Sequence, residues 1–522
     1  MRDQRQGSAG LGYRPGGQDR IPARTAGPRQ ESSLLWLAAL AALSMVVSLL
    51  YSRYLFADSY YDLYAGRYIL RHGIPHRNVV TVAAHGAPWV DQQWLAHVVC
   101  YGAWAVGGYP ALAVLCALLL TSGFTVLGLV MLSRGVPPTR MFLWTSAAII
   151  VYLGNIPIRA QSFAYPLFAL TLWFVVTDGA APRLRARTWL AVPVLVIWAN
   201  THGSVLIGAG IVMLYAVCRA VMAPGRTGYR AALAYVGLGT AAAGSVICTP
   251  YGTGVIYYYK AVNSVTPALG RYVTEWERPD PLYLVSMGFF ALLAAVVIAL
   301  VVAWRRGTRP DPLLAAIALG LLGLALTAIR NQTFFGFAGS LLAADTLARS
   351  TAGRAPVLGR AFSRATAAAL AAAALIGTGL IAAEPGSKFE SLVPVRAIGA
   401  AAALAASHPG SRVLADEWSS PPLLWLHPGM FGRVGFDARL EQYSVAQLNA
   451  YARFLSARAP GWQKLLSGYR IVLVSRQHHD GLASALERVP GWRATYAGRD
   501  GLVLERTPAD LGSRSGGAGA LK

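Results

Sequence analysis

The sequence has few charged residues and almost no lysine. Only 13% of its 522 residues are Asp, Glu, Lys or Arg, against about 25% in ordinary soluble domains, and 55% are hydrophobic. The net charge of +23 is therefore almost entirely arginine, since the lysines are Lys260, Lys388, Lys464 and Lys522. This composition excludes a soluble globular protein and indicates a polytopic α-helical membrane protein.

Cysteine is scarce as well, which excludes two further classes. The four cysteines are Cys100, Cys116, Cys218 and Cys248, all in or beside apolar segments. Their spacing fits neither a disulfide framework nor a zinc site. The polar C-terminal region also lacks a glycine-rich phosphate loop and a nucleophile elbow.

Long apolar runs predict eleven membrane-spanning helices, because about 20 apolar residues cover the hydrocarbon core of a bilayer. The first run, Leu34–Phe56, follows a basic tail over residues 1–32 that is too long and polar for a signal peptide and is expected to be disordered. The other predicted spans are 109–132, 141–157, 160–177, 188–199, 203–222, 231–248, 282–304, 312–329, 333–348 and 365–383. The 188–199 run is short enough to be tilted, buried or half-inserted.

The distribution of basic residues predicts the orientation. With the N-terminus inside and eleven spans, the inner segments carry 21 Lys or Arg residues and the outer parts of residues 33–386 carry nine. This is the positive-inside pattern of plasma-membrane proteins. If Trp94–Gly107 were counted as a twelfth span, the basic residues of the N-terminal half would predict the opposite orientation to those of the rest of the chain. We therefore expect this stretch along the outer surface and the C-terminal region outside the cell, and the arginines require no nucleic acid partner.

Asp58 stands at the outer end of the first predicted span, at the start of an outer loop over residues 57–108. A carboxylate at the membrane surface is a costly placement that needs a reason. The loop pattern predicts a helix over Ser59–His72, an irregular segment over 77–91 and a second surface helix over Trp94–Gly107. The alternative for Asp58 is a helix-end anchor within an interfacial belt of tyrosines.

This arrangement resembles the GT-C class of membrane glycosyltransferases. The residues that carry the resemblance are Asp58-Ser-Tyr-Tyr-Asp62, Gly66, Ile69-Leu-Arg-His-Gly-Ile-Pro75, and Gln93-Trp-Leu95 through Gly107-Gly-Tyr-Pro110. The chain is most similar to bacterial polytopic proteins related to protein mannosyltransferases and aminoarabinose transferases. The resemblance implies a GT-C-like domain over residues 33–386, in which the carboxylate at Asp58 acts with polyprenyl-phosphate-linked sugar donors. Those families usually carry an adjacent acidic pair here, whereas Ser59 follows Asp58.

The implied chemistry gives roles to polar residues at the outer ends of the spans. Transfer leaves negative charge on the donor phosphate, which cations or a divalent metal must stabilise, and the acceptor hydroxyl needs a general base. Asp58 is the first candidate for the base and Asp62 the second; no metal ligands are assigned. The substrate-binding candidates, expected around one outer cavity, are Arg159, His202, Lys260 and Arg330 for the phosphate, Asp91 for the acceptor, and Trp94 and Trp276 for stacking.

Each of these candidates also has a simpler explanation. Arginines at helix ends commonly extend to lipid phosphates, which applies to Arg159 and Arg330. His202 beside Gly203 is a typical packed histidine, and Lys260 follows three tyrosines that favour the interface. Acidic residues such as Glu275 and Glu277 usually form a solvated loop face. The spacing of His72, His76, His85 and His97 is too irregular to predict a metal site.

From about Ser387 the charge rises and the apolar runs end, which predicts an α/β domain over residues 387–510 and a disordered tail over 511–522. The predicted strands are Ser411–Ala415, Gly432–Phe436, Arg470–Ser475, Arg493–Ala497 and Leu502–Glu505, and the predicted helices are Val445–Arg458 and Gly481–Arg488. Asp416 and Asp437 follow predicted strands, where ligands bind but where turn charges are also common. We expect this domain to handle the acceptor.

Three functions remain open on the sequence. The leading hypothesis is a glycosyltransferase that moves a sugar from a polyprenyl-phosphate donor to a glycan, lipid or protein acceptor at the outer face of the membrane. The second is a non-catalytic envelope-assembly protein on the same scaffold. A transporter or flippase ranks last, because spans 203–222, 231–248, 282–304 and 312–329 contain almost no ionisable residues for a central pathway.

Overall fold

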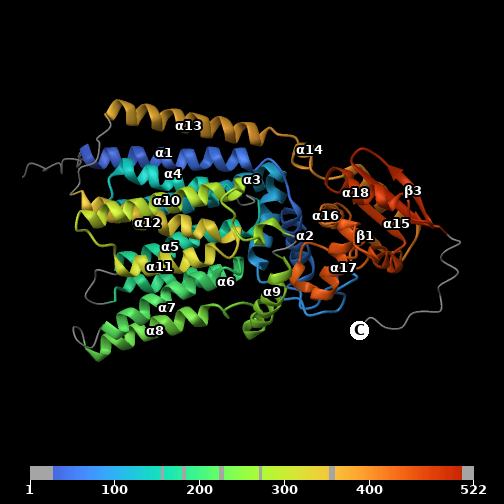
Figure 1. Ribbon diagram of the computed structural model, residues 1–522, viewed down its shortest axis with the longest axis horizontal. Helices are drawn as coiled ribbons and strands as arrows, with labels where there is room; N and C mark the ends of the chain where they lie inside the picture. Colours follow the sequence, from blue (N-terminus) through green and yellow to red (C-terminus); the bar gives the residue numbers. More distant parts are fainter. Residues whose placement is uncertain are drawn as a thin grey trace, which may run out of the picture.

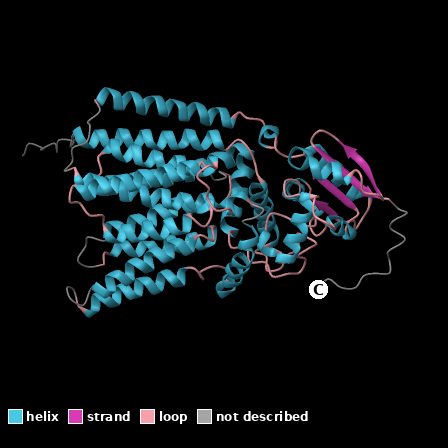
Figure 2. Ribbon diagram, in the orientation of Figure 1, coloured by secondary structure: helices cyan, strands magenta, loops and turns pink. Residues whose placement is uncertain are grey.

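A computed structural model describes residues 28–153, 158–178, 184–222, 228–269, 273–351 and 359–507. The predicted tails fall largely on residues 1–27 and 511–522, outside the described residues. Long helices lie side by side in a bundle, and a small sheet with short helices sits at one end of it (Figure 1). Strands occur only in that end region within the described chain (Figure 2).

Each of the eleven predicted apolar runs contains a helix or most of one among the described residues. These helices are α1 (Pro28–Tyr51), α3 (Trp94–Ser133), α4 (Pro138–Tyr152), α5 (Ala164–Asp178), α6 (Ala191–Thr201), α7 (Val205–Met222), α8 (Tyr229–Ser245), α10 (Leu284–Arg305), α11 (Pro312–Ala325), α12 (Gln332–Ser350) and α13 (Arg360–Ala382). By length and composition, six described helical segments are able to cross a membrane, those that contain α1, α3, α5, α7, α10 and α13. The chain is a membrane protein, and its number of crossings stays a prediction.

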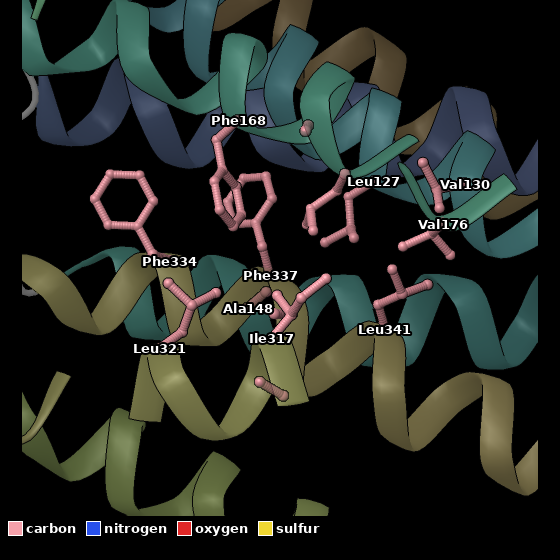
Figure 3. Packing of buried hydrophobic residues seen from close by; sticks show 14 of the residues in the cluster. Leu127, Val130, Ala148, Phe168, Val176, Ile317, Leu321, Phe334, Phe337 and Leu341 are labelled. Atoms are coloured by element: carbon pink, nitrogen blue, oxygen red, sulfur yellow. The ribbon is translucent and has the colours of Figure 1, made fainter. Parts of the chain in front are cut away.

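Aromatic side chains fill the centre of the bundle. Phe337 of α12 stacks on Phe124 of α3 with ring centroids 4.9 Å apart, and Phe334 meets Phe168 of α5 edge-on at 5.1 Å. Figure 3 shows Phe168, Phe334 and Phe337 between facing helices. On the outside, α13 packs on α1 and leaves large apolar residues such as Leu375 exposed, as expected of a helix that faces lipid.

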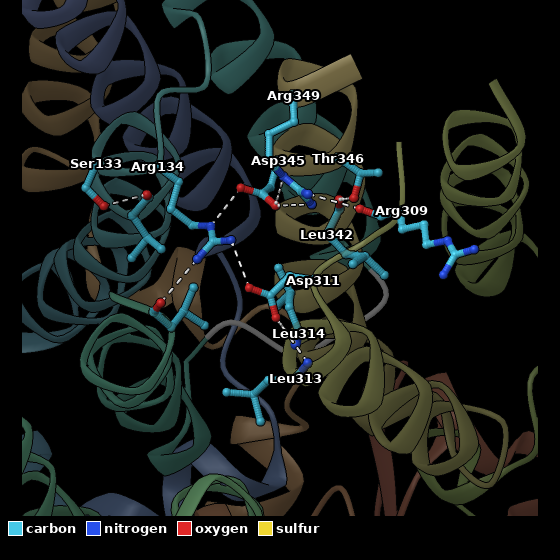
Figure 4. Close-up of polar contacts among 12 residues, drawn as sticks. Ser133, Arg134, Arg309, Asp311, Leu313, Leu314, Leu342, Asp345, Thr346 and Arg349 are labelled. Carbon is cyan, nitrogen blue, oxygen red and sulfur yellow. Dashed lines mark hydrogen bonds and ion pairs between the residues drawn. The ribbon is translucent and has the colours of Figure 1, made fainter. Parts of the chain in front are cut away.

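An ion-pair network around the buried Asp345 joins three helices at the end of the bundle away from the sheet (Figures 1 and 4). Arg134, just after α3, pairs with Asp345 of α12 at 2.7 Å and with Asp311, before α11, at 3.1 Å. Arg349 pairs with Asp345 at 2.9 Å. These residues belong to or border the segments that the charge pattern assigns to the inner side.

The outer loop contains the two predicted helical segments. After α1 the chain turns and α2 (Ala57–His72) begins, and Trp94 starts the long helix α3. Within α3 the backbone leaves helical geometry at Gly107 and Gly108; Gly108 has φ +66°, which glycine adopts without strain. Pro110 follows. The break separates Trp94–Val106 from the apolar remainder of α3, in agreement with the predicted surface helix.

A four-stranded sheet forms the C-terminal region. It consists of β1 (Val413–Ala415), β2 (Ile471–Ser475), β3 (Trp492–Ala497) and β4 (Gly501–Arg506) in the order β1-β2-β4-β3. β1 and β2 run parallel, whereas β4 pairs antiparallel with β2 and β3. The surrounding helices are α14 (Gly386–Phe389), α15 (Val395–Ser407), α16 (Ser420–Leu426), α17 (Val445–Ser456) and α18 (Arg476–Leu486).

The prediction of a strand over Gly432–Phe436 is wrong. Only isolated bridges form there, from Val434 to Thr81 and to Val413. Gly432 has φ +75°, outside strand geometry, and its N–H donates to the carbonyl of Val80 at 2.8 Å. The segment therefore extends the sheet toward the outer loop without becoming a regular strand.

The C-terminal region and the outer loop share one hydrophobic core. Buried residues of α2 and of the first part of α3 pack in one cluster with buried residues of the sheet. A buried ion pair lies at this junction: Arg439 contacts Asp437 at 2.6 Å, both fully buried, and its guanidinium lies 4.2 Å from the ring centre of Trp89. Tyr64 of α2 donates to Asp437 at 2.8 Å. The sheet is thus fixed to the loop that carries Asp58.

Helices α2 and α3 approach each other most closely at Gly66. A Cβ atom there would lie 2.1 Å from the carbonyl oxygen of His97, and backbone cannot yield as a side chain does. We expect Gly66→Ala to lower the free energy of unfolding by about 1–3 kcal/mol or more. Thermal unfolding of the purified protein in detergent measures the loss.

Gly102→Ala on α3 is the matched control. It adds the same methyl group at a helix position where nothing lies within 4 Å of the new Cβ atom. The free energy of unfolding of this variant should therefore equal that of the wild type or exceed it by up to about 1 kcal/mol. Equal melting temperatures for the two variants would contradict the close crossing.

Candidate functional site

Helix α2 places two carboxylates on one face. Asp58 and Asp62 are one turn apart, and Asp58 lies in the first turn, where the helix dipole favours negative charge. Ser59 fixes this end of the helix: its hydroxyl donates to the carbonyl of Ile158 at 2.5 Å and accepts from the N–H of Phe56. Because Ile158 precedes Arg159, the serine that follows Asp58 holds the arginine segment beside it.

Four charged residues form what we call the Asp58 cluster: Asp58, Arg159, Glu275 and Arg330. Arg159 pairs with Asp58 at 3.3 Å and also with Glu275. Glu275, in the short 3₁₀ turn Thr274–Trp276, pairs with Arg330 at 3.2 Å. Arg330 in turn lies over the ring of Trp276, 4.4 Å from its centre. Two cations and two carboxylates therefore balance each other in this cluster.

Access differs sharply within the cluster. The side chain of Asp58 is 37% exposed, whereas that of Arg159 is 6% exposed. A substrate can therefore reach the carboxylate of Asp58 directly. It can approach the guanidinium of Arg159 only from the side of Asp58. This geometry suits a base that takes a proton from an incoming group while a fixed cation stands behind it.

The surroundings shift the pKa values of the two carboxyl groups in opposite directions. Burial opposes ionisation of Glu275, but the charges of Arg159 and Arg330 outweigh it and lower its pKa to about 2. Desolvation by the surrounding protein raises the pKa of Asp58 above its ordinary value; Arg159 opposes this shift and Glu275 adds to it. Glu275 is thus a permanent counterion, while Asp58 is the carboxylate able to exchange a proton.

His202 lies at the end of α6, and its ring nitrogen Nδ1 contacts Ser204. The backbone N–H of Ser204 donates to Nδ1 at 3.2 Å, and the Ser204 hydroxyl lies 2.7 Å from the same atom. The proton of a neutral ring therefore sits on Nε2. Burial, reinforced by Arg330 and Arg159, lowers the pKa of His202 and keeps the ring neutral. Its Nε2–H is a donor for a ligand oxygen.

A second group of buried ionisable side chains contacts α2 at Asp62. His97 lies between two carboxylates, with Nδ1 3.0 Å from Asp91 and Nε2 3.2 Å from Asp62. All three side chains are at most 3% exposed. Burial raises the pKa of Asp62, and the His97 ring opposes that shift. This group connects α2, the loop and α3, and it fixes the helix face that carries Asp58.

The structure brings most of the predicted site residues together. Asp58, Arg159 and Arg330 meet in the Asp58 cluster, and Trp276 lies against Arg330. The charges of Arg330 and Arg159 also contribute to the lowered pKa of His202. Asp62 and Asp91 meet at His97 instead. The Trp94 indole donates to Asn200 at 2.7 Å, which ties the start of α3 to the end of α6.

Lys260 is the predicted residue that lies apart. It is exposed on α9 (Val255–Leu269), and no contact of the described residues joins it to the cluster. Two residues have site roles that the sequence did not predict. Glu275 is an internal counterion of Arg159 and Arg330 rather than part of a solvated loop face, and His97 is buried between Asp62 and Asp91. Only their placement in the same outer layer as Asp58 offered a signal for them.

The acidic residues of the site are already paired with cations. Among the described residues, no group of three or more His, Cys, Asp or Glu side chains is arranged to hold a metal ion.

No protein-family model and no curated relative matches the chain. Among solved structures, the apo oligosaccharyltransferase of Archaeoglobus fulgidus aligns with a TM-score of 0.51 at 11% identity, over 92% of this chain and 75% of that one. Apo ArnT from Cupriavidus metallidurans aligns with a TM-score of 0.49 at 15% identity, over 90% and 97%. The arabinofuranosyltransferase AftD from Mycobacteria gives 0.45 at 14% identity, over 90% and 40%.

These structural neighbours are glycosyltransferases of the GT-C class. The alignment with the oligosaccharyltransferase, which has a TM-score above 0.5, confirms the resemblance to this class at the level of the fold. At such low identity the likeness concerns the fold, so that the activity has to be argued from the site.

The buried His97 bridge gives a prediction about stability. His97→Ala would leave Asp62 and Asp91 buried without their cation, and removal of one partner from a buried ion pair costs about 3–5 kcal/mol. We expect a clear fall in the melting temperature at neutral pH. His85→Ala, at an exposed histidine of the same loop, is the control and should melt like the wild type. Equal behaviour of the two variants would show that the bridge carries no stability.

Proposed function

We propose that the chain is a membrane glycosyltransferase that moves a sugar from a polyprenyl-phosphate-linked donor to an acceptor of the cell envelope at the outer face of the membrane. The observation that carries the proposal is the Asp58 cluster: a reachable carboxylate backed by a buried arginine, in a chain with the GT-C fold. The apolar helices beside it suit a donor with an isoprenoid chain.

In the proposed reaction Asp58 accepts the proton of the acceptor hydroxyl. The acceptor oxygen forms a bond to the anomeric carbon of the sugar, and the bond from that carbon to the phosphate oxygen breaks, so the electron pair leaves with the polyprenyl phosphate. Once protonated, Asp58 no longer neutralises Arg159. The Asp58 cluster then carries one net positive charge, which stabilises the negative charge that develops on the departing phosphate.

The remaining residues of the site have supporting roles in this scheme. Glu275 holds Arg159 and Arg330 at a fixed separation and stays ionised. His202 donates from Nε2 to a sugar or phosphate oxygen, and Trp276 offers a ring face on the side that Arg330 leaves open. Lys260 remains a candidate only if a substrate extends to α9.

Asp58→Asn tests the proposal. The variant keeps the size of the side chain but cannot take a proton, so we expect transfer to fall by about 10²- to 10⁴-fold with an unchanged melting temperature. Mass spectrometry of lipid-linked sugars and envelope glycans, in cells that lack the chain and are complemented with each variant, should show donor accumulation and glycan loss.

Asp280→Asn, at an exposed acid of the same outer layer, should behave like the wild type in this assay. Full transfer by Asp58→Asn would instead favour a non-catalytic envelope-assembly protein on the same scaffold.

The pH dependence of transfer follows from the raised pKa of Asp58. A general base acts when deprotonated, so the rate should be lost as the pH falls through that pKa and should rise to a plateau above it. The midpoint of kcat/KM should lie above the ordinary aspartate value of 3.8. A midpoint at or below 3.8 in the purified enzyme would contradict the assignment of Asp58 as the base.

A further inference from the structure

A cavity of about 430 Å³ lies beside α2, away from the Asp58 cluster. Its walls come from the C-terminal half of α2 and from the turn at residues 428–431 in the C-terminal region. The main lining residues are Arg67, Tyr68, Arg71, His72, Val79 and Phe431. The volume is within the range of about 300–1,000 Å³ that small-molecule sites occupy.

The cavity is separate from the Asp58 cluster. Arg67 and Arg71 follow Asp58 by nine and 13 residues, which at 100° per residue places them on the opposite face of α2. At about 1.5 Å per residue they lie about 14 and 20 Å further along the helix axis. One ligand group cannot touch both places at once.

The lining is cationic and contains no carboxylate. Arg67 is held in place by the carbonyls of Leu424 and Trp425, at 3.2 and 2.7 Å, and lies over the Trp425 ring. Arg71 is exposed and forms neither an ion pair nor a hydrogen bond in the part of the chain that the structure describes. Like charges four residues apart on a helix repel each other, so an anion between the two guanidinium groups would relieve an existing cost.

Aromatic rings form the other part of the wall. Tyr68 stacks on His72 with centroids 4.6 Å apart and on Phe431 at 6.0 Å, in both cases with planes within 30° of parallel. Tyr68 and Phe431 are half-buried. The accessible parts of such rings pack against the apolar C–H groups of a sugar, whereas a free inorganic anion would gain nothing from them.

We propose that this cavity binds an anionic sugar residue, whose phosphate or carboxylate group pairs with Arg71 and Arg67 and whose ring packs on Tyr68 and Phe431. Phosphate and carboxylate share the planar, bidentate recognition that arginine provides. The site is independent of the proposed transfer chemistry, because no residue of the Asp58 cluster lines it.

The test is a titration of the purified full-length protein, in nanodiscs of neutral phosphatidylcholine, with glucose 6-phosphate, glucuronate and glucose. We expect saturable binding of at least one of the two anionic sugars, weakened by salt, and binding of glucose on the order of tenfold weaker or less. Arg71→Ala should weaken the binding of the anionic sugar by on the order of tenfold or more. Arg499→Ala, which removes an equal charge from the exposed β3–β4 turn, should leave it unchanged.

A second variant separates the ring from the charge. Tyr68→Leu should weaken the binding of the anionic sugar, whereas inorganic phosphate should bind as it does to the wild type.

The proposal fails if neither anionic sugar binds, or if Arg71→Ala and Arg499→Ala behave alike. It also fails if Arg330→Gln abolishes binding and Arg71→Ala does not, because the sugar would then occupy the Asp58 cluster. Binding of phosphatidylglycerol alone, in nanodiscs that contain it, would assign the cavity to a lipid headgroup and overturn the sugar assignment.

Discussion

The close crossing of α2 and α3 is the constraint on which the outer layer depends. Gly66 lets the backbone of α2 reach the carbonyl of His97, and the His97 ring then lies between Asp62 and Asp91. This fixes the rotation of α2 about its axis. One face then presents Asp58 to the bundle end, and the opposite face supports the C-terminal sheet and the cationic cavity. Any slip at this crossing would move both faces together.

Charge compensation explains how so many ionised groups coexist in an apolar protein. Burial of an unpaired charge costs several kcal/mol, so each inner cation needs a carboxylate. Glu275 serves Arg159 and Arg330 at once, which leaves Asp58 as the exposed fourth member. A proton taken by Asp58 therefore changes the net charge of the cluster. The same pairing that stabilises the fold therefore supplies the proposed transition state with one net positive charge.

The apolar runs predicted the bundle because a span of hydrophobic residues forms a helix wherever backbone groups have no water to bond. A boundary in α3 after Gly107 was predicted as well, because the distribution of basic residues is consistent only if Trp94–Gly107 is not counted as a span. The strand over Gly432–Phe436 was mispredicted, because its short β-rich pattern does not reveal the positive φ of Gly432. The local pattern also missed α15 and α16, which pack against the sheet and α2.

Sequence by itself determined the membrane class and the helical runs, because hydrophobicity acts over short stretches of chain, and it singled out Asp58 as a candidate carboxylate. Only the tertiary structure decided the partners of that carboxylate. Arg159, Glu275 and Arg330 are separated by 116 and 55 residues along the chain, and their ion pairs depend on where the helix ends meet. The same holds for His97: pairing across a bundle is a property of packing, which residue order does not encode locally.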